Sequence, residues 1–271
     1  MRRPSPAPTA SLLFRTACLA AAAALFVCGA QANDAAARRI IGFSPDGRYF
    51  AFEQYGTLDW SESDSGYSEI AILDTQTDQF VGGKPIKVVD DAHSSTMTEK
   101  QARSRAAALA APLLAKYSIA PRGERAAFDI FTFPDENLKR NDIARLEDLS
   151  QKWLSLDVDT PTHISTIQLD DLIVESAVDC SASSLEGQPP IPAGKARGFR
   201  LSLEGPAGKA MLHEDKATPA SRDCPTSYSL SEVYVFEPKD KPPVIAVLVQ
   251  RFSQGWEGRD RRFIAVTGQI H

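Results

Sequence analysis

Residues Val244–Val249 read VIAVLV, six apolar residues in a row. An unbroken apolar run of this length is expected for a strand buried on both faces, because a strand with one solvated face alternates apolar and polar residues. On either side of it, Gly198–Glu204 (GFRLSLE) alternates, and Arg262–Ile270 (RFIAVTGQI) predicts a final strand. With further strand and turn patterns over residues 121–271, these runs predict an α+β protein that consists mostly of antiparallel β-sheet.

The N-terminal part of the protein, residues 38–81, is predicted to form a β-hairpin unit. Ser44–Gly47 (SPDG) lies between two apolar runs, and its Pro, Asp and Gly each favour a tight turn. A further strand is predicted at Ser68–Leu73, after a polar loop. This order resembles one blade of a TolB-type or WD-like β-propeller. Because a propeller repeats its blade about every 40–50 residues and SPDG occurs once, we expect a sandwich-like or partial propeller-like fold.

One main helix is predicted near residues 96–117. Thr96 and Glu99 have the spacing of a capping box in which Thr96 is the N-cap. Pro112 predicts a kink or a restart, since proline disrupts the interior of a helix. Four residues at helical spacing define the face that we expect to be buried: Ala102, Ala106, Leu109 and Leu113.

The β-rich portion after this helix, residues 121–271, contains a possible short helix within Asp142–Leu156. Two strands are predicted at Ile164–Leu169 and Leu172–Val178, with Asp170-Asp171 separating them. Adjacent residues on a strand point to opposite faces, so these two carboxylates are not expected to form a catalytic dyad.

Residues 1–32 show the three-part pattern of a secretory signal peptide. Three arginines and no acidic residue accompany an apolar run at Ala17–Gly29, and the small-x-small site Ala30–Ala32 predicts cleavage after Ala32. The run is shorter than the roughly 20 residues that a helix needs to span a bilayer. We therefore expect a single periplasmic or secreted domain, residues 33–271, without stable membrane insertion.

The chain that remains after cleavage is acidic. Residues 1–32 hold three of the 30 basic residues and none of the 35 acidic ones, which leaves 27 basic against 35 acidic residues and a net charge of −8. Nucleic acid and anionic membrane surfaces attract basic proteins. Neither is therefore an expected partner.

Two of the four cysteines, Cys18 and Cys28, lie in the predicted signal peptide. The other two, Cys180 and Cys224, are predicted to form one disulfide, because an oxidising compartment favours pairing of two thiols. The bridge would close a loop of about 45 residues, worth about 4 kcal/mol in the chain-entropy model. A metal-binding or catalytic cysteine is the alternative, and no CxxC motif or Cys–His cluster supports it.

The sequence contains no recognisable motif for catalysis, cofactor binding or metal coordination, and we predict no residue for any of these roles. His213-Glu214-Asp215 offers one nitrogen and two oxygen ligands, but a hydrated turn after a strand is the favoured interpretation. Asp59–Asp64 is oxygen-rich, yet it lacks the Gly and Glu that an EF-hand loop requires, so a solvated loop is favoured. Ser221 and Ser253 have no recognisable base.

The densest charged cluster runs from Trp256 to Arg262 (WEGRDRR) and joins two apolar strands. Its three arginines fit a clamp for a carboxylate or a phosphate, since the guanidinium fork suits both. The favoured alternative is that they pair with Glu257 and Asp260 and lock a hairpin. A speculative ligand-binding turn is therefore assigned to four residues: Trp256, Arg259, Arg261 and Arg262.

Several blocks of the chain resemble a family of predicted secreted proteins of unknown function from Gram-negative bacteria. They are Gly42–Gly56, Ala111–Ile119, Leu212–Pro225 and Glu257–Gly268. The resemblance implies a periplasmic or secreted protein and transfers no catalytic residue, cofactor or ligand. It also places Cys224 in a recurrent block, SRDCP, which fits the disulfide.

Two functions are compatible with these features. The favoured one is a non-enzymatic binding or envelope-associated module that recognises an unidentified protein or envelope component through sheet edges or loops. The alternative is a periplasmic hydrolase whose site is assembled from residues distant in the sequence, which motifs would not show. A small-molecule site at the arginine turn would require a pocket flanked by Arg259, Arg261 or Arg262.

Overall fold

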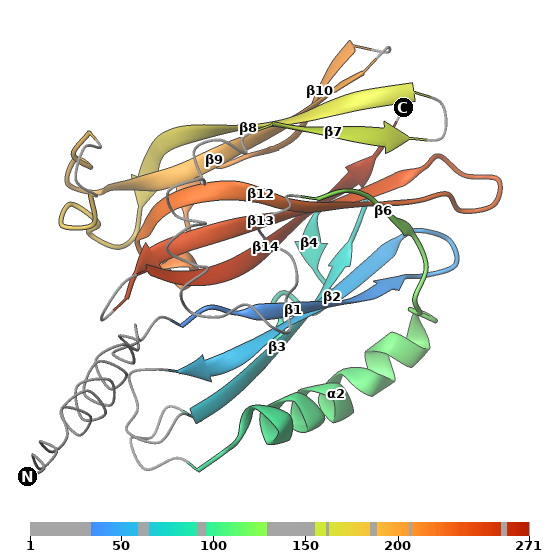
Figure 1. The fold of residues 1–271 in the computed structure, drawn as a ribbon, viewed down its shortest axis with the longest axis horizontal. Helices are drawn as coiled ribbons and strands as arrows, with labels where there is room; N and C mark the ends of the chain where they lie inside the picture. The colour runs from blue at the N-terminus through green and yellow to red at the C-terminus, as the bar shows by residue number, and fades with distance from the viewer. Residues whose placement is uncertain are drawn as a thin grey trace, which may run out of the picture. The chain divides into compact units, whose positions relative to one another are not determined.

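The computed structural model describes residues 34–58, 65–90, 96–128, 155–160, 163–184, 189–205, 208–255 and 259–270. Within these ranges the protein contains three β-sheets and one α-helix, and Ala32–His271 forms one compact unit (Figure 1). The predicted mostly antiparallel fold with one main helix is thus confirmed. None of the described helices is long and apolar enough to cross a bilayer. The predicted signal peptide lies outside the described residues.

The central sheet contains the stretch VIAVLV. Its strand order is β14-β13-β12-β6, all antiparallel. The bounds are β6 (Glu124–Phe128), β12 (Pro225–Phe236), β13 (Val244–Gln254) and β14 (Arg259–Gln269). Along β13, Ile245, Val247 and Val249 pack in one core cluster, and Val244, Ala246 and Leu248 pack in another. The prediction that this strand is buried on both faces is therefore confirmed.

A second sheet covers one face of the central sheet. Its strands are β7 (Ser155–Thr160), β8 (His163–Ser176), β9 (Lys195–Gly205), β10 (Gly208–Glu214) and β11 (Ala217–Thr218). The prediction of two strands separated by Asp170-Asp171 is wrong, because β8 runs through both residues. Asp170 lies opposite Arg200 on β9, and Asp171 lies opposite Phe199. The two aspartates therefore belong to the β8–β9 ladder, where a break between two strands was predicted.

The third sheet is built from the N-terminal unit and covers the other face. Its strands are β1 (Ala37–Phe43), β2 (Tyr49–Leu58), β3 (Ser65–Asp74), β4 (Gln79–Phe80) and β5 (Ile86–Val88). The predicted hairpin is formed by β1 and β2. In its turn, the Asp46 carboxylate accepts hydrogen bonds from the Ser44 hydroxyl and the Arg48 N–H, and Gly47 has a φ of 73°. The turn chemistry therefore acts as the sequence indicates.

Helix α2 (Glu99–Lys116) packs on the outer face of the β1–β5 sheet. The predicted N-cap is wrong by two residues: the cap is Thr98, whose hydroxyl accepts from the Gln101 N–H, and Gln101 completes the capping box. Of the predicted kink or restart at Pro112, the restart is wrong, because the helix continues through this residue. That proline lies on the exposed face, where water can hydrogen-bond the carbonyl that proline leaves unpaired.

The buried face of α2 agrees with the prediction except at Leu109, and Leu113 packs partly buried against the same cluster as Ala106. Ala102, Ala106 and Ala110 are buried, whereas Leu109 is 60 % exposed. Small side chains let the helix lie close to the sheet. At Gly66, an added Cβ would meet the backbone of Thr98 and Glu99 at the start of the helix.

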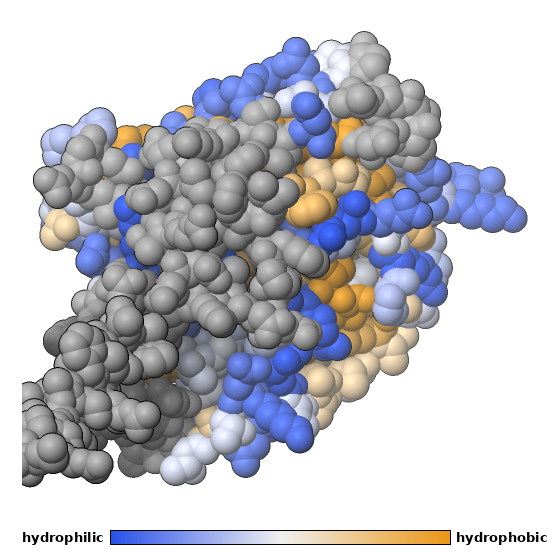
Figure 2. Space-filling model, viewed as in Figure 1, coloured by the Kyte–Doolittle hydropathy of each residue, from blue (hydrophilic) through white to orange (hydrophobic). Residues whose placement is uncertain are grey.

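The layers therefore stack in the order β7–β11 sheet, central sheet, β1–β5 sheet and α2 (Figure 1). An aliphatic cluster lies between the first two layers and an aromatic-rich cluster between the second and third. Figure 2 shows hydrophobic residues between the layers and hydrophilic residues toward the outside of this face. Most of the possible short helix within Asp142–Leu156, as well as the whole of the Asp59–Asp64 loop, lies outside the described residues.

Candidate functional site

A cavity of about 490 Å³ lies along the outer edge of β14, the last strand of the central sheet. The β1–β5 sheet contributes Phe52, Leu73 and Phe80 to its lining, and the turn before β4 contributes Asp78. The opposite side is lined by His213 of β10 and by the segment that follows β11. We call this cavity the edge cleft. Its volume falls within the range of about 300–1,000 Å³ that is typical of ligand pockets.

Side chains from the β1–β5 sheet cap parts of the β14 edge. The Gln54 amide bonds both ways to Phe263: Oε1 accepts from its N–H at 2.8 Å, and Nε2 donates to its carbonyl at 3.3 Å. Further along, Asp78 Oδ1 accepts from the N–H and the hydroxyl of Thr267 at 2.8 and 3.0 Å. These bonds satisfy edge groups that would otherwise be open to pairing with another chain.

Three arginines line the edge cleft. Arg251 and Arg262 lie directly opposite each other on β13 and β14, and Arg222 ends the short helix η4 (Ala220–Arg222). Arg222 forms an ion pair with Asp215 at 2.6 Å, and Arg262 forms one with Asp34. Two of the three cations are therefore neutralised by carboxylates.

Arg251 differs from its two neighbours. Within the described ranges, its guanidinium has no carboxylate partner: Nη1 donates to the Arg222 carbonyl, and Nε has no hydrogen-bond acceptor. Burial lowers the pKa of Arg251, and the adjacent Arg262 cation lowers it further. Among the described residues, the cleft therefore contains one arginine, Arg251, that no carboxylate pairs with directly.

His213 adds a further charge on the other side of the cleft. Its Nε2 lies 2.9 Å from Asp215 Oδ1, and its Nδ1 lies 3.5 Å from Asp78 Oδ2. Although burial lowers the pKa of His213, the hydrogen bonds to Asp215 and Asp78 outweigh it and raise the pKa to about 9. The imidazole is therefore a cation at neutral pH, held between two carboxylates.

The predicted hydrated turn at His213-Glu214-Asp215 is wrong. Asp215 is only 7 % exposed, and it also accepts a hydrogen bond from the Phe199 N–H at 2.9 Å. The sequence suggested a turn because three polar residues follow a strand. In the structure, the Asp215 side chain is buried and contacts Phe199 of β9, Arg222 of η4 and His213. Across the part of the chain that the structure describes, no group of three His, Cys, Asp or Glu residues is arranged to hold a metal ion.

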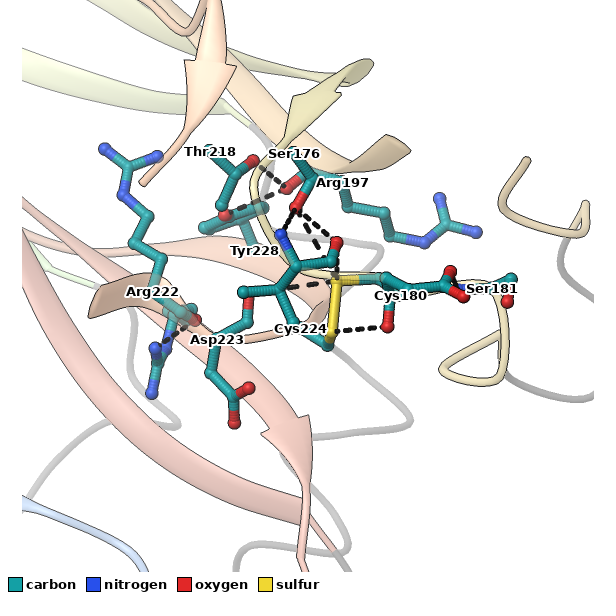
Figure 3. The surroundings of a disulfide bond; sticks show 12 residues. Ser176, Cys180, Ser181, Arg197, Thr218, Arg222, Asp223, Cys224 and Tyr228 are labelled. Atoms are coloured by element: carbon teal, nitrogen blue, oxygen red, sulfur yellow. Dashed lines mark hydrogen bonds between the residues drawn. A yellow bond between two sulfur atoms is a disulfide. The ribbon is translucent and has the colours of Figure 1, made fainter. Parts of the chain in front are cut away.

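The disulfide between Cys180 and Cys224 is formed, and it fixes the segment that carries Arg222. Figure 3 shows Arg222, Asp223 and Cys224 on one stretch of chain that the bridge joins to the loop after β8. Asp223 has a φ of 55°, a conformation that few residues other than glycine adopt. The bridge thus holds a tight turn beside the cleft.

The three described residues of the predicted ligand-binding turn have different surroundings. Arg262 lines the edge cleft, whereas Arg261 is 1 % exposed and donates to the Ala36 carbonyl and the Gln250 side chain. Arg259 begins β14 and is not among the residues that line the cleft. Trp256 lies outside the described residues.

The sequence prediction did not include Arg222 and Arg251 as companions of Arg262. A signal for Arg251 does exist, because Arg251 and Arg262 lie four residues before and four residues after the segment 255–258, a spacing that pairs them across a hairpin. No sequence signal joins Arg222 or His213 to the cleft, since Arg222 ends η4 and His213 belongs to β10, both outside the central sheet.

Comparison with known proteins gives one match. The family model described as "Predicted secreted protein (DUF2259)" matches residues 51–269, well over half of the chain. Neither the curated proteins nor the solved structures include a significant match. The likeness of residues 38–81 to a propeller blade stays a prediction.

Proposed function

The chain belongs to the family of predicted secreted proteins DUF2259, and from this premise we propose that it is a non-enzymatic binding protein of the periplasm or extracellular space. The proposal includes removal of the signal peptide after Ala32 and binding of an anionic ligand in the edge cleft. The ligand is a carboxylate- or phosphate-bearing molecule, free or part of a protein or envelope component. Nucleic acid is not expected as a partner, because the mature chain is acidic.

Arg251 carries this proposal. Like charges directly opposite each other on neighbouring strands destabilise a sheet, and Arg251 lies opposite Arg262 without a carboxylate of its own among the described residues. A bound carboxylate or phosphate would supply the missing negative charge through charge-assisted hydrogen bonds. The cost of keeping Arg251 in the free protein is therefore explained by a ligand.

The geometry around His213 favours binding over hydrolysis. A hydrolytic histidine needs one ring nitrogen free to take a proton from the nucleophile. Both ring nitrogens of His213 face carboxylates, and the raised pKa keeps the ring protonated. Ser221 also lines the cleft, but His213 cannot serve it as a base in this state. This argues against the alternative of a periplasmic hydrolase.

Native mass spectrometry of the protein purified from the periplasm, repeated after denaturation, tests the proposal first. The denatured mass should fit cleavage after Ala32 and the loss of two hydrogens at the disulfide. The native mass should show an additional anionic molecule. A bare monomer would direct the search to ligands lost in purification or to protein partners.

A binding measurement then tests the cleft itself. Inorganic phosphate or succinate, compared with sodium chloride at equal ionic strength, should raise the Tm of the wild type in a saturable manner. Arg251→Gln should abolish the effect. The matched control is Arg200→Gln, which removes an arginine paired with Glu214 outside the cleft. An equal response of the Arg251→Gln variant and the wild type would contradict the proposed function.

A further inference from the structure

Between Phe263 and Thr267, the edge of β14 has one position, Ala265, for which the described residues offer no partner. Three N–H groups of β14 point away from β13. The N–H of Arg261 donates to the Asp34 carbonyl, that of Phe263 to the Gln54 side chain, and that of Thr267 to the Asp78 carboxylate. In a regular antiparallel ladder alternate residues point the same way, and the pairing of β13 with β14 has no bulge. The N–H and carbonyl of Ala265 therefore also point outward, into the cleft that Ala265 lines.

No hydrogen-bond partner for these two groups of Ala265 occurs among the residues that the structure describes. When an extended peptide adds to the edge of a sheet, it forms two main-chain hydrogen bonds with the outward N–H and carbonyl of one strand residue. A single residue is open, because Gln54 closes the edge at Phe263 and Asp78 closes it at Thr267. The edge therefore accepts only a short segment of a peptide.

The direction of such a segment follows from the charges. Arg262 lies three residues before Ala265, about 10 Å along the strand, and Arg251 lies opposite Arg262. A peptide antiparallel to β14 would direct its carboxyl end toward these arginines, whereas a parallel one would bring an ammonium group there. Gln54 already occupies the N–H and carbonyl of Phe263, so the peptide cannot pair there. An antiparallel peptide therefore has room for one further residue after the residue that pairs with Ala265, and it ends at that residue.

The residue that pairs with Ala265 is then the penultimate one. Directly opposed residues in a ladder project their side chains to the same face. The Ala265 side chain belongs to the cluster that contains Phe52 and Leu73, and both of these residues line the cleft. The penultimate side chain would therefore meet an apolar wall and should itself be apolar.

We propose that the edge cleft binds the carboxyl terminus of a peptide, with an apolar penultimate residue hydrogen-bonded to Ala265 and the terminal carboxylate held by Arg251 and Arg262. This inference rests on the proposed function and adds the ligand class. A lone phosphate or dicarboxylate would use the arginines alone and leave Ala265 unpaired.

Isothermal titration calorimetry with synthetic peptides tests the inference on the mature, disulfide-bonded protein. The probe is acetyl-Gly-Leu-Gly with a free carboxyl terminus, and it should bind. Its carboxyl-terminal amide should bind at least tenfold more weakly, because it lacks the anion. The affinity of a version with N-methylleucine should fall by a similar factor, because the methylated nitrogen cannot donate a hydrogen bond to the Ala265 carbonyl. Free-acid binding should shift the Ala265 amide resonance in nitrogen–proton NMR spectra.

Two variants extend the test. Arg251→Gln should reduce the affinity for the free-acid peptide at least tenfold, whereas Arg200→Gln should not change it. Ala265→Pro removes the outward N–H without removing a ladder bond, as proline allows on an edge strand, and should weaken peptide binding while leaving phosphate binding intact. The N-methylated peptide makes the corresponding test without altering the protein.

The outcomes separate the two proposals. Equal affinity for the acid, the amide and the N-methylated peptide overturns the peptide inference. If phosphate still stabilises the wild type and not the Arg251→Gln variant, the proposed anion site stands without it. If neither phosphate nor any peptide responds to Arg251→Gln, both proposals fail.

Discussion

The two halves of the β13–β14 hairpin share one hydrogen-bond ladder and differ in the chemistry of their side chains. In the apolar half, Val244–Val249 pairs with Ile264–Gln269 and is buried between two sheets. In the arginine half, Arg251–Gln254 pairs with Arg259–Arg262, and two of its arginines line the edge cleft. The apolar half contributes to the core, whereas the arginine half pairs Arg261 and Arg262 with the segment 34–36 and leaves Arg251 without a carboxylate among the described residues.

The contrast separates residues that stabilise the fold from residues that we propose bind a ligand. Burial of apolar side chains contributes roughly 1.5–3 kcal/mol for each large residue, which offsets the cost of holding Arg251 beside Arg262. Because both halves belong to the same strands, the rigid apolar half positions the arginines with little freedom. The following predictions, in order of expected size, separate the two roles.

Removal of the disulfide should have the largest effect. The double variant Cys180→Ser/Cys224→Ser should unfold with about 4 kcal/mol less free energy, because the loop of 44 residues is no longer closed in the unfolded state. It should also bind phosphate more weakly, since Cys224 tethers the segment that carries Arg222. Chemical denaturation and the phosphate-dependent Tm shift measure the two effects. Unchanged phosphate binding would show that the bridge does not support the arginine half.

Truncation of a side chain in the apolar half should destabilise the protein without changing its affinity for phosphate. Leu248 is fully buried, so Leu248→Ala should cost about 3 kcal/mol from lost burial and the cavity left behind. Phosphate binding at a temperature where the variant is folded should match the wild type. Met211→Ala, at a residue 56 % exposed, is the surface control and should change the stability by less than about 0.5 kcal/mol. A loss of phosphate binding in Leu248→Ala would break the separation between the halves.

The charged residues around the cleft should make stability depend on pH. Because the pKa of His213 is raised from 6.5 to about 9, the protonated form is stabilised by folding. This contribution is complete below pH 6.5 and is lost as the pH rises through 9, by about 2 kcal/mol after allowance for partial exposure. Denaturation at several pH values measures it. The His213→Gln variant should lose less free energy of unfolding than the wild type as the pH rises. Leu248→Ala should lower the free energy of unfolding by the same amount at every pH.

The smallest effect should have the opposite sign. Arg251→Gln removes a cation that faces Arg262, so the free protein should become more stable by about 0.5 kcal/mol. Chemical denaturation at low salt measures the gain, which added salt should diminish. Arg200→Gln breaks a pair with Glu214 on the surface and should not stabilise the protein. A clear loss of stability in Arg251→Gln would mean that this arginine is structural.

Local patterns in the sequence predicted the parts of the fold that near neighbours decide. The apolar run at Val244–Val249, the alternation at Gly198–Glu204 and the turn chemistry of Ser44–Gly47 each act through residues that are close in the chain. The pairing of Cys180 with Cys224 also followed from the sequence, because two thiols remain after the predicted signal peptide. Errors arose where two local signals competed: Thr98 replaced Thr96 as the helix cap, and β8 continued through Asp170.

Only the tertiary structure decided the order of the layers and therefore the candidate site. Arg222 and His213 come from the β7–β11 sheet side, Gln54 and Asp78 from the β1–β5 sheet side, and Arg251 and Arg262 from the sheet between them. Periodicity shows which face of a strand is buried, but it does not show which strand becomes the edge of a sheet. That choice depends on contacts between residues far apart in the chain, such as Gln54 and Phe263, which are 209 positions apart. Short-range patterns in the sequence thus predicted most of the elements, and the stacking of three sheets brought the residues of the candidate site together.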